Sequence, residues 1–406
     1  MNEQFDSKFS VKIVTTEEEI KKLTHLTSYA FIPAPTDLTK PQIGFESLKN
    51  SFIQSVYPKD QEFPVATATC IPMTQNVRGK IFKMGGIAAV ATQPEYRMQG
   101  IIRHLMTNIF IHAQEIGEIF STLFPFKESF YAKFGYISLP QNKIGTFSIE
   151  KLSSIRDMKL AGTVKHFYLK DVFDQYYNFT VEVQAKIHGM SIASKETTDF
   201  INVSKPSYVA FAYENNKITG CFVYTTKGAG GPVDIRYFYY VNANAKYLLL
   251  QFLARHIDQF TQVNLPILPT ENQELWLNDL SLKVSTRTWA NNPMGRIMNV
   301  EGLQGIQVGT GSLIIKIIDE QCEWNEGIFT FSSNNGILNV KKESNDEFKA
   351  DCSLTISGLT ALVYGGYNIE DFPFRNWITN YPTSKEFFQK IKELFTPVIP
   401  FMHEDF

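Results

Sequence analysis

Residues 86–106 read Gly-Ile-Ala-Ala-Val-Ala-Thr-Gln-Pro-Glu-Tyr-Arg-Met-Gln-Gly-Ile-Ile-Arg-His-Leu-Met. The small and β-branched residues at 87–92 predict a short strand buried on both faces, and Pro94 ends it. From Gly100 onward apolar residues recur every three or four positions, which predicts a helix ending near Gly117. That apolar stripe comprises Ile102, Leu105, Met106, Ile109, Phe110 and Ala113. A strand, a tight loop and a helix therefore follow one another.

The loop itself carries the first sign of a ligand. Arg97, Met98, Gln99 and Gly100 place successive backbone N–H groups at a helix N-terminus, where unpaired donors and the helix dipole favour an anionic phosphate. Gly100 would let a diphosphate approach the main chain closely. A plain strand-to-helix turn is the other interpretation of the same residues.

These residues resemble the phosphate-binding motif of the GNAT acetyltransferases, a strand followed by [R/Q]-x-x-G-x-[G/A]. Ile102 occupies the last, usually small, position and departs from that general pattern. The stretch is also similar to the Eis-like (enhanced intracellular survival) acetyltransferases, whose pattern is P-x-[H/Y]-R-x-x-G-[L/I]-[L/I]-R. The matching residues are Pro94, Tyr96, Arg97, Gly100, Ile101, Ile102 and Arg103. The resemblance implies acetyl-CoA as cosubstrate, bound by Val90, Ala91, Thr92, Arg97, Met98, Gln99, Gly100, Ile101, Ile102 and Arg103.

A second segment agrees with this family. Residues 119–124 predict a strand, and residues 129–136, Ser-Phe-Tyr-Ala-Lys-Phe-Gly-Tyr, resemble the family's F/I-Y-x-[R/K]-F-G-Y. The resemblance places Tyr131 beside the sulfur of coenzyme A, as the acid that protonates the departing thiolate. In a chain with 14% aromatic residues, a tyrosine packed in a core is the alternative interpretation.

The length of the chain and the order of its expected strands and helices predict three domains with an α+β fold. The 406 residues divide into 1–149, where strands and helices alternate, 150–289, where that texture returns without the loop, and 290–406, where β segments and turns dominate. Expected strands lie at 11–14, 65–71, 207–213, 217–226, 233–241, 311–318, 327–340 and 351–356, and expected helices at 16–29, 172–184, 243–260, 358–365 and 384–394. Residues 32–41, with three prolines, predict a loop.

This order has the form of the Eis-like proteins, which carry two tandem GNAT-type domains followed by a domain like the sterol carrier proteins. In that family the terminal carboxylate enters the first domain's active site as the base. The resemblance gives this role to Phe406, and Glu404 and Asp405 beside it could attract a cationic substrate. Solvated charges of a tail are the alternative for those two residues. Hexamers are likewise implied only by the family.

Composition limits which partners and which cellular compartment we expect for this chain. The 39 basic and 41 acidic residues leave a formal charge of -2, with no basic block to follow a phosphate backbone, so nucleic acid is an unexpected partner. No apolar stretch approaches a membrane span, and the first residues lack a signal-peptide core. Four widely spaced cysteines predict reduced core thiols, and seven histidines form no metal-binding pattern. We therefore expect a cytoplasmic protein without a metal site.

The sequence thus favours an acetyl-CoA-dependent N-acetyltransferase acting on a primary amine, of the aminoglycoside, polyamine or lysine type. A carrier of a hydrophobic ligand, with inactive acetyltransferase modules, is the alternative from another class. A dinucleotide-binding enzyme is disfavoured, because Gly309-Thr-Gly311 and residues 228–231 lack the G-x-G-x-x-G spacing between a strand and a helix.

Overall fold

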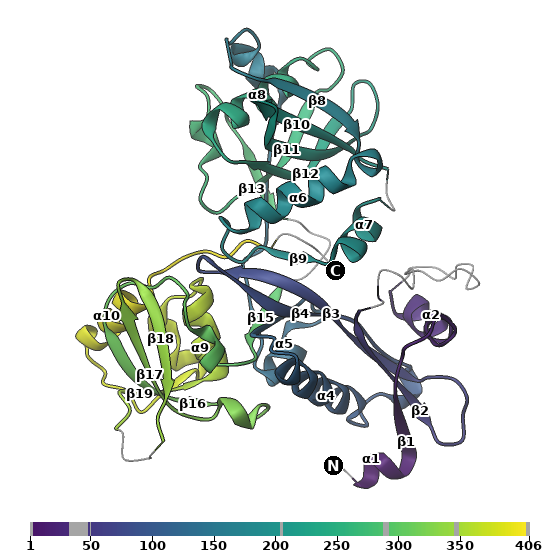
Figure 1. Ribbon diagram of the computed structural model, residues 1–406, viewed down its shortest axis with the longest axis vertical. Coiled ribbons are helices and arrows are strands. Elements are labelled where there is room, and N and C mark those ends of the chain that lie inside the picture. The colour runs from purple at the N-terminus through teal and green to yellow at the C-terminus, as the bar shows by residue number, and fades with distance from the viewer. Residues whose placement is uncertain are drawn as a thin grey trace.

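The computed structural model describes residues 3–31, 48, 50–203, 206–286, 292–344 and 349–402. It has three sheets, and Figure 1 shows the second domain above the first with the third beside it. The expected loop at 32–41 lies outside the described residues, as do Glu404, Asp405 and Phe406.

The first domain is built on a sheet of order β1-β2-β3-β4-β5-β15-β6, with β9 paired to β3. Its elements are α1 (Glu3–Lys8), β1 (Phe9–Ile13), α2 (Glu17–Phe31), β2 (Phe52–Pro58), β3 (Ala66–Val77), β4 (Lys80–Thr92), η1 (Pro94–Tyr96), α4 (Ile101–Glu115), β5 (Phe120–Leu123), α5 (Glu128–Tyr131), η2 (Ala132–Phe134) and β6 (Ile137–Ser138). α2 begins with a reciprocal capping box, in which the N–H of Glu19 donates to Thr16 Oγ1 and the N–H of Thr16 donates to the Glu19 carboxylate.

The second domain has a sheet of order β14-β7-β13-β12-β11-β10-β8. Its elements are β7 (Lys143–Ser148), η3 (Ile149–Ile155), β8 (Thr163–Tyr168), η4 (Leu169–Asp171), α6 (Phe173–Gln184), β9 (Ser191–Ala193), α7 (Lys195–Val203), β10 (Tyr208–Glu214), β11 (Lys217–Thr226), β12 (Pro232–Tyr240), α8 (Ala243–Ala254), β13 (Gln262–Ile267), η5 (Gln273–Leu275) and β14 (Lys283–Thr286). A tight turn joins β10 to β11, and Asn215 and Asn216 both have positive φ there. The helix expected at 243–260 is shorter and ends at Ala254.

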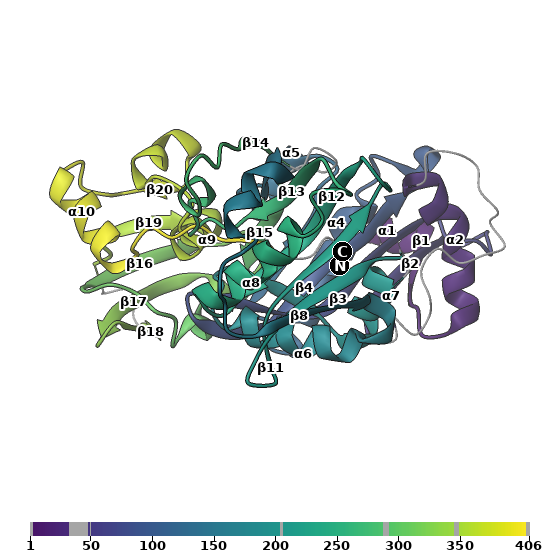
Figure 2. The ribbon, with the colours of Figure 1, turned by 90° about the horizontal axis from the view of Figure 1, so that it is seen from above.

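The third domain has a sheet of order β18-β17-β16-β19-β20. The elements from residue 294 onward are β15 (Met294–Ile297), η6 (Glu301–Leu303), β16 (Ser312–Ile318), η7 (Glu323–Asn325), β17 (Gly327–Asn334), β18 (Ile337–Lys342), β19 (Cys352–Thr355), α9 (Ile356–Tyr364), η8 (Ile369–Asp371), η9 (Pro373–Arg375), β20 (Ile378–Thr379) and α10 (Lys385–Leu394). All nine residues of α9 are buried, because the helix is enclosed between its own sheet and β15 of the first sheet. Seen from above, this domain forms one end of the molecule and α2 the other (Figure 2).

Three strands cross the expected boundaries at 149/150 and 289/290. β7 precedes the first boundary yet belongs to the second sheet, and β9 leaves the second domain to pair with β3. β15 follows the second boundary but lies between β5 and β6 of the first sheet. The sheets therefore exchange strands across the boundaries that we expected from the sequence.

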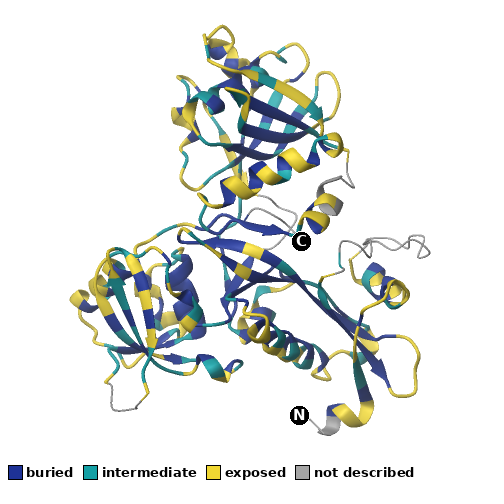
Figure 3. Ribbon diagram, in the orientation of Figure 1, coloured by how far each residue is buried: buried dark blue, intermediate teal, exposed yellow. Residues whose placement is uncertain are grey.

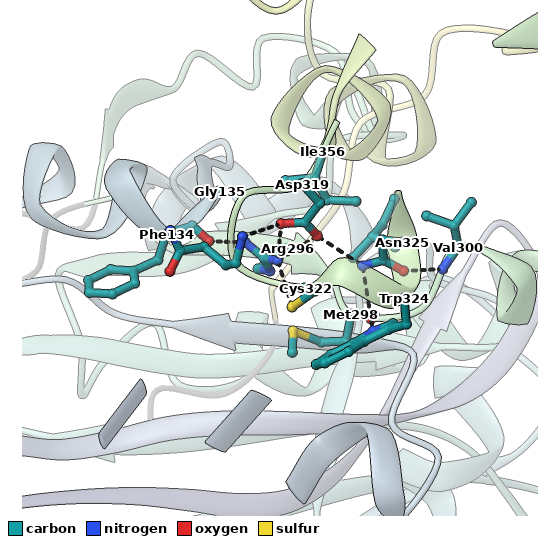
Figure 4. A network of polar contacts seen from close by, with 12 residues as sticks. Phe134, Gly135, Arg296, Met298, Val300, Asp319, Cys322, Trp324, Asn325 and Ile356 are labelled. Atoms are coloured by element: carbon teal, nitrogen blue, oxygen red, sulfur yellow. Dashed lines mark hydrogen bonds and ion pairs between the residues drawn. The ribbon is translucent and has the colours of Figure 1, made fainter. Parts of the chain in front are cut away.

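A buried polar network ties β15 to the third domain (Figure 4). Arg296 is fully buried and donates to both oxygens of Asp319 at 2.8 and 2.7 Å and to the carbonyl of Phe134. Asn325 donates to Asp319 at 2.9 Å and accepts from the N–H of Val300 at 3.0 Å. Because burial makes an unpaired charge costly, this network fixes how the two domains meet.

The cores follow the sheets (Figure 3). One cluster joins Phe82, Met84 and Phe120 of the first sheet to the apolar faces of β16–β19 and α9, so the first and third domains share a core. The four cysteines, Cys70, Cys221, Cys322 and Cys352, are buried and free, which confirms the prediction of unpaired core thiols. Among the described residues, no helix is long and apolar enough to cross a membrane.

Candidate active site

A β-bulge interrupts β4 in the middle of the stretch quoted above. The register between β3 and β4 shifts between Thr67 and Thr69, and Ala89 has φ of 52°. An alanine in this left-handed region costs roughly 1 kcal/mol, which the surrounding sheet must offset. Ala88, Ala89 and Val90 are half-exposed, so the prediction of a strand buried on both faces is wrong at this point.

The bulge coincides with the place where β4 leaves its parallel neighbour. β4 and β5 pair only from Met84 with Phe120 to Ile87 with Leu123. Beyond that point, within the described residues, no strand pairs with residues 88–92 on the β5 side. A wedge therefore opens between β4 and β5.

The alternation of hydrogen bonds between β4 and β3 identifies which N–H groups of β4 face this wedge. The N–H of Gln93 donates to the carbonyl of Val65 at 2.8 Å. Ala91, two residues before Gln93, lies opposite Thr67 and occupies the equivalent position of the ladder. Because hydrogen-bonded pairs alternate along an antiparallel ladder, Ala91 directs its N–H to β3, whereas Thr92 directs its N–H toward the wedge. Val90 lies within the bulge itself, where this ladder is interrupted.

The loop after β4 is open and uncapped. Residues 97–100 are all exposed, Met98 and Gly100 have φ of 63° and 78°, and no side chain caps α4 at Gly100. A Cβ added at Gly100 would meet no atom of the described residues within 4 Å. The first-turn donors of α4 thus face free space beside consecutive loop N–H groups, an arrangement that suits an anion.

The loop is held by its neighbours. Arg97 Nε donates to the carbonyl of Thr92 at 3.3 Å, and the Tyr96 hydroxyl accepts from Gln61 Nε2 at 2.7 Å. α4 buries the predicted stripe except for half-buried Ile102, and adds Ile101 to it. Its two histidines pack against aromatic rings: His104 stacks on Phe5, and His112 stacks on Phe52 in the same way.

Tyr131 ends α5 and is 3% exposed. Its ring packs against Phe126, Phe130 and Tyr136, with centroids 5.1 to 6.2 Å away. It belongs to the same buried cluster as Ile87, with Val90 at the border of that cluster. Burial raises the pKa of Tyr131 far above its usual value, so the hydroxyl keeps its proton at neutral pH.

Gly135, in the segment after Tyr131, is required by close packing. It has φ of 82°, and a Cβ there would collide with Arg296 and Ile356. The motif therefore sits directly on the network of Figure 4, which sequence inspection did not reveal.

The chain returns to the junction of the first two domains before its end. The N–H of Phe401 donates to the carbonyl of His188 at 2.8 Å, and the Phe401 ring is buried in a cluster with Tyr237 and Tyr239. Met402 is 1% exposed, and its carbonyl accepts from Asn142 Nδ2 at 2.6 Å. The four residues that follow can extend at most about 14 Å from this anchor.

His188 links all three domains at that anchor. Its Nδ1 accepts from the N–H of Arg78 at 3.0 Å, so its Nε2 carries the hydrogen toward the Tyr364 carbonyl, also at 3.0 Å. Burial lowers the pKa of His188 to about 4. Arg78 in turn donates to the carbonyls of Leu362 and Val363 at the C-terminal end of α9. No sequence motif pointed to either residue.

Comparisons with known proteins agree with this geometry. Residues 12–138 match the model of the acetyltransferase (GNAT) domain. The first domain is thus similar to GNAT acetyltransferase domains. Residues 302–403 match the model of the sterol carrier protein domain, which places that fold after the second sheet. Among curated proteins, none matched the sequence.

Solved structures share the whole arrangement. A probable N-acyltransferase from Enterococcus faecalis is 22% identical, with a TM-score of 0.80 over 98% of this chain and 99% of that one. A GCN5-related N-acetyltransferase from Anabaena variabilis is 20% identical, with a TM-score of 0.80 over 98% and 100%. Eis1 from Mycobacterium abscessus is 14% identical, with a TM-score of 0.76 over 98% and 100%. The predicted α+β fold, two tandem GNAT-type domains and a sterol carrier protein-like domain, is thereby confirmed.

Proposed function

We propose that this chain is an N-acetyltransferase that moves the acetyl group of acetyl-CoA directly onto a primary amine. The observation that carries the proposal is the coincidence of a bulged, diverging strand, an uncapped phosphate loop and a buried, protonated tyrosine within one GNAT domain.

The site residues fit the cosubstrate. Residues 97–103 would hold its diphosphate through loop and first-turn N–H groups, since neither a capping side chain nor a neighbouring atom occupies the space at Gly100. Acetyl-CoA, when bound, would supply an activated acetyl thioester. The N–H groups of Val90 and Thr92 would polarise the thioester oxygen and stabilise the oxyanion.

Proton transfers are assigned to two groups. An amine with a pKa near 10 is mostly protonated at neutral pH, so a base must remove a proton before nitrogen can attack. The terminal carboxylate of Phe406 is the proposed base, and Glu404 and Asp405 would attract a cationic acceptor. Tyr131 would donate its proton to the departing thiolate, and its hydroxyl carries that proton at neutral pH.

The carrier alternative has less support. The third domain's helix α9 is buried along its whole length, and its core is continuous with that of the first domain. An apolar ligand there would have to displace this packing. Micromolar binding of a fluorescent fatty acid would favour the carrier.

The decisive experiment follows free thiol release from acetyl-CoA on a panel of aminoglycosides, polyamines and lysine peptides. The intact protein is compared with one lacking residues 404–406, and cofactor affinity is measured separately by calorimetry. We expect amine-dependent release that the truncation abolishes while acetyl-CoA still binds. Cofactor binding without acetylation of any amine would refute the acceptor class, and unchanged turnover after truncation would refute the base.

A further inference from the structure

Residues 398–402, which precede the chain end, are held where all three domains meet. Phe401 is 3% exposed and packs in the core of the second domain. Met402, the next residue, is 1% exposed and packs in the core that the first and third domains share. Because two adjacent side chains fill two different cores, the segment cannot shift by one residue without emptying both. Its register is therefore fixed.

A buried glutamine of β3 joins this segment to each domain. Gln75 Nε2 donates to the carbonyl of Gly189 in the second domain at 3.0 Å and to Met402 Sδ at 3.4 Å. Gln75 Oε1 accepts from the hydroxyl of Tyr364, in α9 of the third domain, at 2.7 Å. Gln75 is fully buried, so each of these bonds would be costly to lose. The network ties Met402 to all three domains.

Gly189 leaves room for the segment. It has φ of 85°, and a Cβ at this residue would lie 2.6 Å from Pro400 Cβ and 2.7 Å from the Phe401 nitrogen. Real Cβ atoms do not come so close to other atoms, so any larger residue here must displace the segment or be displaced by it. His188, the preceding residue, accepts the N–H of Phe401 at 2.8 Å. This turn of the second domain therefore lies directly against the segment.

Asn142 holds the other end of the segment and lies near the wedge. Its Nδ2 donates to the Met402 carbonyl at 2.6 Å. Asn142 follows Ser138 of β6 by four residues, which span at most about 14 Å. Ser138 lies opposite Met294, and Met294 lies opposite Leu123, the last residue of β5 that pairs with β4 before the wedge. Met402 is therefore held on the side of the sheet where the wedge opens.

We propose that Asn142 and Gly189 are positioning residues for acetyl transfer, which hold Met402 and Phe401 so that the carboxylate of Phe406 reaches the wedge. The inference rests on the proposed role of Phe406 as the base. Neither positioning residue touches the reacting atoms, and both act through the chain end. The second domain thereby contributes to the chemistry of the first.

Steady-state kinetics on the full chain test the proposal with Asn142→Ala and Gly189→Ala. We expect each change to lower kcat about 10-fold or more, because a displaced base no longer meets the amine. The Kd for acetyl-CoA, measured by calorimetry, should stay within about two-fold of the wild type, because neither residue belongs to the proposed cofactor loop.

Carboxypeptidase digestion followed by mass spectrometry reads the position of the segment without using activity. In the wild type the enzyme should remove residues 403–406 and stop at Met402, because the residues before that point are packed in the cores. In Asn142→Ala and Gly189→Ala digestion should continue through Met402 and Phe401. A purely structural role elsewhere in the fold would not move this end point.

The matched controls carry the same changes away from the segment. Asn244→Ala removes a similar bond, from Asn244 Nδ2 to the Ala161 carbonyl at 2.7 Å. Gly228→Ala places alanine at a similar φ of 89°, where a Cβ would meet no atom of the described residues within 4 Å. Both controls should keep the kcat and the digestion end point of the wild type. Thermal unfolding checks that each variant is folded, and Asn142→Ala provides the test if Gly189→Ala is not.

The outcomes separate this inference from the proposed function. Unchanged kcat in the folded positioning variants, or digestion beyond Met402 in the wild type, would overturn the positioning role and leave the acetyltransferase intact. An intact chain that acetylates no amine on the panel would refute the proposed function, and this role with it.

Discussion

The segments β4–α4 and β12–α8 share the backbone arrangement of their strands but differ in the connection from the strand to the helix. Both strands leave a parallel neighbour at the place where they bulge. Eight residues, 93–100, connect β4 to an uncapped α4, whereas two residues connect β12 to α8, which Asn242 caps. The wedge is therefore a property of the sheet, and the proposed phosphate site is a property of the loop.

The regions after β5 and β13 differ as well. Tyr131 follows β5 in a short helix, packed beside the cluster that borders the wedge. Residues 268–282 follow β13 and contain no tyrosine. By this comparison the first domain combines the loop with a buried tyrosine, the proposed proton donor, and the second domain has neither at the corresponding positions.

Removing that donor is the largest expected change. Tyr131→Phe should lower kcat about 10²- to 10³-fold, because the thiolate would leave without its proton, while the Kd for acetyl-CoA stays within about two-fold. Steady-state kinetics and calorimetry measure both. Tyr136→Phe is the matched control, since the Tyr136 hydroxyl bonds Ser121 in the core. Normal turnover in Tyr131→Phe would remove this residue from the mechanism.

The ends of the two helices differ in charge. Glu118, just past α4, is 2% exposed, and burial raises its pKa to about 7, opposed by a hydrogen bond from Cys70 and by Lys83. In α8 the buried polar side chain is the neutral Gln251, which donates to the carbonyls of Ile155 and Met158.

Because the folded pKa of Glu118 exceeds the unfolded one, its contribution to stability is full below about pH 4.5 and is lost as the pH rises to about 7. The loss amounts to about 3 kcal/mol at most. Urea unfolding at pH 5 and pH 8 should show Glu118→Gln gaining on the wild type at the higher pH. Parallel behaviour of the two proteins would contradict the shifted pKa.

A side chain at the N-terminus of α4, like the one that caps α8, should lower the affinity of the first domain for acetyl-CoA. Gly100→Asp keeps a residue that tolerates positive φ but adds a carboxylate at the phosphate loop, so acetyl-CoA affinity should fall about 100-fold or more. Calorimetry measures the affinity. Asn242→Gly is the control and should neither change it nor lower stability by more than a few tenths of a kcal/mol. Retained affinity in Gly100→Asp would show that the diphosphate lies elsewhere.

The smallest effect concerns the bulge. Ala89→Gly should raise the free energy of unfolding by about 0.5–1 kcal/mol, because glycine adopts positive φ without strain. Ala212→Gly, at the β10 bulge of the second domain, should destabilise by about 1 kcal/mol, since Ala212 is buried and Gly loses more entropy on folding. Urea unfolding compares the two. A destabilised Ala89→Gly would mean that the left-handed conformation costs nothing here.

Local signals predicted most of the elements near the site. The strand, loop and helix of residues 86–117 are confirmed within a few residues. Helical periodicity and turn residues act over a few positions, so the sequence expresses them directly. The bulge at Ala89 left no such signal, because an alanine rarely adopts positive φ.

The sequence by itself determined the loop, the tyrosine motif and the order of three α+β domains, since each depends on residue types at short spacing. Only the tertiary structure decided that β7, β9 and β15 cross between the sheets, that Arg296 is neutralised by Asp319, and that His188 anchors the returning chain. These features bring together residues from 23 to more than 200 positions apart. No local pattern encodes such pairings, because the free energy of burial that selects them depends on the assembled core.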